Sequence, residues 1–139
     1  MRECILLFAF EASKQKKLMT QLFMAKFRVK SVGTEEMHLP IGYLAGNKEL
    51  MTQEVIPPEA EHTKTLDSPM LVMAGVTPGR LDMVLGAIRK AGIGAIPYKA
   101  VVTEANQTWK AEELLEELKK EHEAMTAEKG KGKMIHQTQ

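Results

Sequence analysis

Hydrophobic residues follow two patterns along this chain, and each pattern occurs twice. Residues 4–10 and 70–76 are apolar on both alternating faces, which is typical of strands buried on both sides of a sheet. Each run precedes a segment with apolar residues three and four positions apart, as in an amphipathic helix. The first of these segments presents Leu18, Met19, Leu22 and Phe23 on one side, and we expect that side to be buried.

The second helix has clear boundaries in the sequence. Thr77 and Pro78 provide an N-cap and a first-turn proline, and Gly92 stands where a left-handed C-terminal cap is needed. Two shorter segments also predict strands. Residues 28–32 alternate polar or charged side chains with valine, and residues 95–103 contain Pro97. Both features are typical of edge strands.

Two β-α-β units in tandem predict an α/β (α+β) protein of the ferredoxin-like kind, a split β-α-β sandwich. We expect a four-stranded antiparallel sheet with the first and third strands in the centre. A further helix begins near Thr108 and carries an apolar stripe of Ala111, Leu114, Leu115 and Leu118. This helix should cover the sheet face that the two crossover helices leave open.

The domain organisation follows from the segments between these elements. We expect a single domain over residues 1–128, with an unusually long connection at 34–69 and a glycine- and lysine-rich flexible tail at 129–139. Within the connection, residues 39–46 are apolar and framed by glycine, which predicts a short helix or turn packed on the body. Residues 53–68 contain prolines and charges and are expected to be flexible.

Composition excludes several classes of protein. The 139 residues include 19 Lys plus Arg and 18 Asp plus Glu, a formal net charge of +1, without the basic excess of a general nucleic-acid binder. The second buried strand also lacks the aromatic residues on which RNA-binding sheets stack bases, so nucleic acid is disfavoured as a partner. The longest apolar run, residues 5–10, is too short to span a membrane. The single cysteine, Cys4, excludes an internal disulfide and fits a reducing, cytoplasmic setting.

No metal, cofactor or catalytic residue is predicted. His38, His62, His122 and His136 lack the spacing of metal ligands, and we expect them at the surface. Cys4 is followed by Ile5 and Leu6, and these apolar neighbours favour an unreactive core thiol over a nucleophile.

Four residues are the candidates for ligand binding. Gly79 and Arg80 open the second helix, whose free N–H groups and positive end could receive a small anion, although a plain strand-to-helix turn is the preferred interpretation. Tyr43 and Trp109 are aromatic residues in glycine- or polar-flanked segments, where a ring can line a pocket or anchor a loop. Structural anchoring is preferred for both.

The chain resembles a small bacterial family that is catalogued only as a domain of unknown function. The resemblance rests on residues 40–46, 71–75, 85–94, 99–103 and 106–109 and extends over most of residues 3–123. It implies a short bacterial protein with no assigned activity, cofactor or catalytic residue. The layout is also loosely similar to that of small trimeric signalling proteins with a long loop between the second and third strands.

Three functions stay open from the sequence. The first is a non-enzymatic regulatory or ligand-binding module that takes a small anionic ligand. The second is a protein–protein interaction subunit, and either of these could form a homo-oligomer. The third is an enzyme, whose site would lie between residues 42–46, 75–80 and 106–109.

Overall fold

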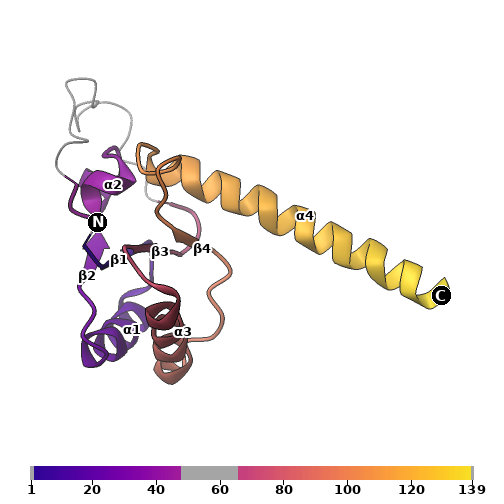
Figure 1. Cartoon of the computed structure of the whole chain (residues 1–139), viewed down its shortest axis with the longest axis horizontal. Helices are drawn as coiled ribbons and strands as arrows, with labels where there is room; N and C mark the ends of the chain where they lie inside the picture. Colours follow the sequence, from indigo (N-terminus) through magenta and orange to yellow (C-terminus); the bar gives the residue numbers. More distant parts are fainter. Residues whose placement is uncertain (1, 48–65, 139) are drawn as a thin grey trace.

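The computed structural model describes residues 2–47 and 66–138, with side chains through residue 125. A four-stranded sheet forms its centre, with the strand order β2-β1-β3-β4 (Figure 1). The elements along the chain are β1 (Cys4–Phe8), α1 (Ala12–Met24), β2 (Val29–Val32), a 3-10 turn (Thr34–Glu36), α2 (Ile41–Leu44), β3 (Met70–Ala74), α3 (Pro78–Ala91), β4 (Lys99–Val101) and α4 (Ala111–Thr138).

The sheet is mixed, so the expectation of an antiparallel ferredoxin-like sheet was wrong. β1 pairs with β2 in parallel and β3 with β4 in parallel, and only the central pair β1–β3 is antiparallel. Each crossover helix returns the chain to the strand next to the one it left, so each β-α-β unit is closed rather than split. The predicted positions of β1 and β3 in the centre and of β2 and β4 at the edges are confirmed.

The boundaries of α3 follow the local sequence as predicted. The Thr77 hydroxyl oxygen accepts a hydrogen bond from the backbone N–H of Arg80 at 3.4 Å, and Pro78 occupies the first helical position. At the other end Gly92 has a φ of 65°, the left-handed conformation that a residue without Cβ adopts at little cost.

Helices α1 and α3 cover one face of the sheet (Figure 1). Both helices return along the strands that precede them, and because β1 and β3 are antiparallel the two helices are antiparallel as well. The residues buried between the helices and the sheet include Ile5, Leu7, Leu18, Leu22, Leu71, Met73, Val84 and Ile88.

The opposite face is covered by α2 and by the start of α4. Ala111, Leu114 and Leu115 are buried against Leu6, Phe8, Met70 and Val72, and half-buried Leu118 packs beside them, which confirms the predicted role of this helix. Helix α2 also bonds to the loop that precedes α4, because the N–H groups of Ile41 and Gly42 donate to the carbonyls of Trp109 and Gln107 at 2.9 and 2.7 Å.

The long connection is described at both of its ends. Residues 39–46 contain α2 and bury Leu39, Ile41 and Leu44, so the predicted packed helical turn is confirmed. On the far side Leu66 joins the same core cluster, and Asp67 forms an ion pair with Lys119 of α4. Most of the segment expected to be flexible, residues 53–68, lies outside the described residues.

Helix α4 continues well past the sheet and ends at Thr138 (Figure 1). Its first turns pack on the core, whereas the side chains from Glu121 to Met125 are exposed. Residues 129–138, expected to form a flexible tail, are helical, and their mobility stays a prediction.

Replacing Leu115 with alanine tests the role of α4. We expect the free energy of unfolding to fall by about 2–5 kcal/mol, because the substitution leaves a cavity between α4 and the central strands. Denaturant titration measures the change. Met125→Ala is the control on the same helix: its side chain is 58% exposed, and the change should stay within about 0.5 kcal/mol. Equal midpoints for wild type and Leu115→Ala would show that α4 does not stabilise the sheet.

Candidate functional site

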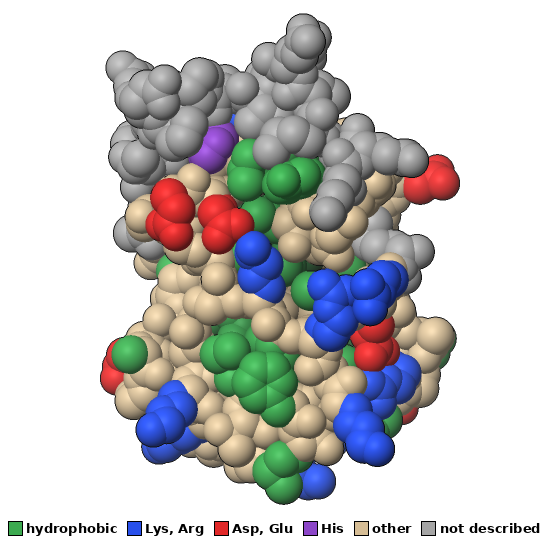
Figure 2. Space-filling model, turned by 90° about the vertical axis from the view of Figure 1, so that its left-hand side faces the viewer, with side chains coloured by type: hydrophobic (Ala, Val, Ile, Leu, Met, Phe, Trp, Pro, Cys, Tyr) green, Lys and Arg blue, Asp and Glu red, His purple; other side chains and the backbone are tan. Residues whose placement is uncertain are grey.

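The outer side of α1 and α3 exposes large hydrophobic side chains. Phe23, Met24 and Met83 are 52%, 72% and 44% exposed. Figure 2 shows hydrophobic side chains gathered in its lower half, at the level of α1, with lysine and arginine side chains around them. The helical spacing of its apolar residues predicted Phe23 on the buried side of α1, and that expectation was wrong. Leu18 and Leu22 fill the contact with the sheet, and Phe23 turns away from it.

A groove runs between the two helices on this side. It consists of two hollows of about 320 and 440 Å³ that share Gln21 and Lys90. The first hollow lies toward the end of α1 and the start of α3, and the second lies toward the opposite ends of the two helices. The remaining lining residues are Met24, Ala25, Met83, Gly86 and Ala87 in the first, and Ser13, Lys16, Lys17, Thr20 and Ala91 in the second.

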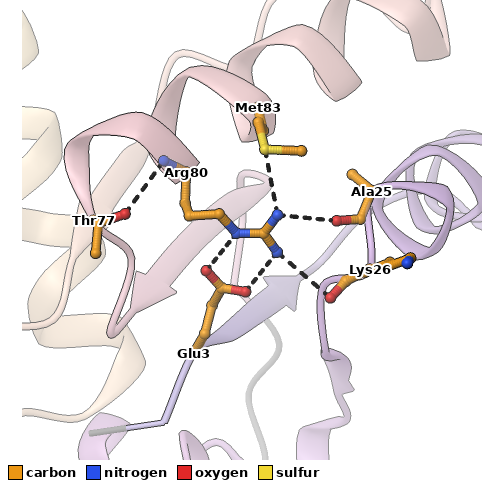
Figure 3. Close-up of polar contacts among 6 residues, drawn as sticks. All are labelled: Glu3, Ala25, Lys26, Thr77, Arg80 and Met83. Carbon is orange, nitrogen blue, oxygen red and sulfur yellow. Dashed lines mark hydrogen bonds and ion pairs between the residues drawn. The ribbon is translucent and has the colours of Figure 1, made fainter.

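Arg80 lies next to Ala25 and Met83, which line the first hollow, and its guanidinium is bonded to other residues of the protein (Figure 3). Its Nε and Nη2 atoms donate to the two carboxylate oxygens of Glu3 at 2.9 and 2.7 Å, a bidentate ion pair. Nη1 and Nη2 also donate to the carbonyls of Ala25 and Lys26, at 3.2 and 3.5 Å. The guanidinium therefore joins α3 to the start of β1 and to the end of α1.

This arrangement stabilises an unusual helix end. Lys26 follows α1 with a φ of 65°, a left-handed conformation that glycine commonly adopts and that strains other residues. The last carbonyls of a helix lack partners within the helix and carry partial negative charge, which the Arg80 cation complements. The guanidinium also lies over the Phe27 ring, 4.0 Å from its centroid, in a cation–π contact.

The ion pair shifts the protonation of Glu3. The hydrogen bonds from Arg80 stabilise the carboxylate and lower the pKa of Glu3 below its ordinary value of 4.5, although partial burial opposes the shift. The same bonds raise the pKa of Arg80. Glu3 was missed in the sequence because it lies outside the periodic strand and its partner is 77 residues away.

The four predicted ligand-binding residues fall into two separate groups. Gly79 and Arg80 lie at the start of α3, on the face that α1 and α3 cover. Tyr43 and Trp109 are half-buried and pack on the core cluster of the opposite face, near α2 and α4. The sheet separates the two groups, so the four residues do not form one pocket. The packing of Tyr43 fits the anchoring interpretation, whereas Trp109 both packs on the core cluster and lines a hollow of about 340 Å³ beside α4.

The histidines and the cysteine differ in their surroundings. His38 is only 7% exposed, so the expectation of a surface position was wrong for it: it stands between Met37 and Leu39 in the segment that covers the sheet. His122 is exposed and its ring meets that of Tyr98 edge-on, with centroids 5.7 Å apart. Within residues 2–47 and 66–125, no three His, Cys, Asp or Glu side chains converge as metal ligands would. Cys4 is buried, and burial raises the pKa of its thiol.

Comparison with known proteins finds a family model that matches part of the second half of the chain. Residues 69–125 match the model of a family described as a domain of unknown function, DUF3783. The match begins just before β3 and ends within α4, so it covers the second β-α-β unit and the part of α4 that packs on the sheet. The resemblance to a family of unknown function is confirmed over these residues. No curated protein and no solved structure matches the chain. In the described part of the chain, none of the helices has the length and apolar character needed to cross a membrane.

The Glu3–Arg80 pair predicts a pH dependence of stability. The pKa of Glu3 is lowered in the folded state, so the pair stabilises the protein above the unfolded-state value of about 4.5, and this contribution is lost as the pH falls through the folded-state pKa. Glu3→Gln should therefore lower the free energy of unfolding at pH 7, and the difference from wild type should shrink at acidic pH. Denaturant titration from pH 7 to pH 3 measures it. A difference that is constant over this range would contradict the assignment.

The anion site expected at Gly79 and Arg80 can be tested against the same pair. The Glu3 carboxylate already occupies the guanidinium as an anionic ligand would, so a ligand must compete with it. We expect Glu3→Gln to bind phosphate more tightly than wild type, with saturable NMR shifts of the amides of residues 76–81. Arg80→Ala should abolish these shifts. Equal titrations of wild type and Glu3→Gln would show that the guanidinium does not bind the anion.

Proposed function

We propose that this protein is a non-enzymatic protein-binding module, and that the outer side of α1 and α3 is its binding surface. The observation that carries the proposal is the exposure of Met24 and Met83 in the lining of a groove, with Phe23 exposed next to Met24 on α1. Scattered hydrophobic residues on a surface need no explanation, but Met24 and Met83 line the same hollow from two different helices.

Energetics favour covering this surface. Each exposed large side chain can contribute about 1.5–3 kcal/mol when it is fully buried against a partner. The inner sides of both helices already pack on the sheet through Leu18, Leu22, Val84 and Ile88, so the fold itself does not require the outer residues to be hydrophobic.

The residue types also suit binding. Methionine is unbranched and polarisable, so it adapts to the shape of a partner, and phenylalanine adds a large apolar area. Lysines around the hydrophobic residues keep the free surface soluble and form the polar rim that is usual at protein interfaces.

This proposal selects the interaction subunit from the functions that the sequence left open. The small-ligand hypothesis relied on Gly79, Arg80, Tyr43 and Trp109. The ion pair of Arg80 and the packing of Tyr43 and Trp109 support structural roles for these three side chains. The proposal keeps the expected bacterial, cytoplasmic setting, in which the buried Cys4 thiol stays reduced. Self-association is one form that the interaction could take.

Site-specific photo-crosslinking tests the binding surface. A benzophenone amino acid at Met83, in cells that naturally make the protein, should give a discrete adduct of protein size because the partner covers this position. The same residue at Glu104, an exposed position in the loop after β4, is the matched control and should give none. Adducts of equal yield at both positions, or none at Met83, would contradict the proposal.

A further inference from the structure

We infer that the occupant of the α1–α3 groove is an acidic amphipathic helix of another protein. The inference rests on the proposed function and adds the chemical class of the partner. It follows from the dimensions of the groove, from the residues that line it and from the distribution of charge on the molecule.

The groove has the length of a short helix. It extends from Ser13 to Met24, nearly the whole of the 13-residue α1, which corresponds to about 20 Å. Because α1 and α3 are antiparallel neighbours, a third helix can lie along the furrow between them and bury a narrow apolar stripe. A partner helix of three to four turns fills this length.

Small residues let such a helix approach closely. Ala25, Gly86 and Ala87 line the first hollow between the two methionines. A Cβ atom built on Gly86 would have only the Arg89 guanidinium nearby, at 3.8 Å, so this position is open. The methionine side chains stand beside these small residues and can fold over the apolar side chains of the occupant.

The charge of the lining selects an acidic occupant. Lys16, Lys17 and Lys90 line the second hollow, and α1 contains no acidic residue between Ala12 and Met24. Helix α3 contains one carboxylate, Asp82, and two cations, Arg89 and Lys90, in addition to Arg80, whose charge is paired with Glu3. Electrostatic complementarity therefore favours carboxylates along both sides of the partner's apolar stripe.

A second copy of this chain fits less well. Two α1–α3 surfaces placed face to face would bring lysines against lysines. The acidic α4 of a neighbouring copy has complementary charge, but its apolar stripe of Ala111, Leu114 and Leu115 is already buried on its own sheet. The described part of α4 thus has no free stripe for the groove, which favours a different chain as the partner.

Selection from a random peptide library tests the partner class. A displayed library of peptides of about 16 residues, long enough for four helical turns, is selected on the full-length protein and counter-selected on Gly86→Leu. Leucine at this open helical position fills the groove without removing a core side chain. We expect the enriched peptides to carry net negative charge and apolar residues at i, i+3 or i+4, and i+7. Basic or non-helical consensus sequences, or no groove-dependent peptide, would overturn the inference.

Binding of one enriched peptide is then measured by fluorescence anisotropy on matched variants. Lys90→Glu should weaken binding about tenfold or more by placing a carboxylate against the acidic peptide, and added salt should weaken binding to the wild type. Lys120→Glu makes the same change on an exposed position of α4 and should leave binding unchanged. Thermal melts verify that each variant folds. If Gly86→Leu fails to fold, Gly86→Ala replaces it as the milder substitution in the groove. Equal effects of the two charge reversals would overturn the inference.

Two further results separate this inference from the proposed function. If Met83 crosslinks to a protein but the library yields no acidic peptide that depends on the groove, the proposed binding surface stands and the acidic helix is refuted. Tighter, Gly86→Leu-sensitive binding of a 20-nucleotide single-stranded DNA than of any peptide would identify a nucleic acid as the occupant and refute both.

Discussion

The antiparallel pair β1–β3 is the interaction on which the rest of the structure depends. All residues of both strands are buried, and the pair joins them in register from Cys4 opposite Ala74 to Phe8 opposite Met70. Strands that are apolar on both faces need a covering layer on each side, since no face can be left to water. Helices α1 and α3 cover one side, and α2 with the start of α4 covers the other. The second layer is built from residues of the long connection and of the C-terminal helix, so segments that look peripheral in the sequence complete the core.

The pairing pattern gives the two β-α-β units equivalent places in the sheet. In each unit a helix joins a central strand to the edge strand beside it: α1 joins β1 to β2, and α3 joins β3 to β4. The register centres on Leu6 opposite Val72, as an approximate twofold axis through the sheet requires. The match to the family of unknown function covers only the second unit and part of α4. Without the first unit, β3 would have an open, fully apolar edge, which is a ready site for aggregation. The first unit thus completes the sheet for the matched segment.

Local features of the fold could be read from the sequence, and long-range ones could not. Apolar runs identified the central strands, Thr77 and Gly92 marked the ends of α3, and the stripe of Leu114 and Leu115 placed α4 on the sheet. The same strands and helices are compatible with a split or a closed β-α-β unit. The periodicity of apolar residues indicates which face of an element is buried, but not which strand pairs with its neighbour in the sheet. The exposure of Phe23 was missed for a related reason. A stripe at helical spacing can be wider than the contact, and the width of the contact depends on where the second helix lies. Glu3 gave no signal, since an isolated acidic residue pairs with Arg80 only once the two units have met.

Arg80 connects the stability of the fold with the shape of the binding surface. Its guanidinium holds the end of α1 through the carbonyls of Ala25 and Lys26 while its own backbone belongs to α3, so it fixes the two helices where the groove begins. Nη1 also donates to the Met83 sulfur at 3.3 Å, which orients one of the exposed methionines. Arg80, which the sequence offered only as a candidate anion ligand, bonds within the protein, and it would affect partner binding by setting the spacing of α1 and α3. The bidentate geometry suits this role better than a lysine would, because a planar guanidinium can bind the Glu3 carboxylate and the helix-end carbonyls at the same time.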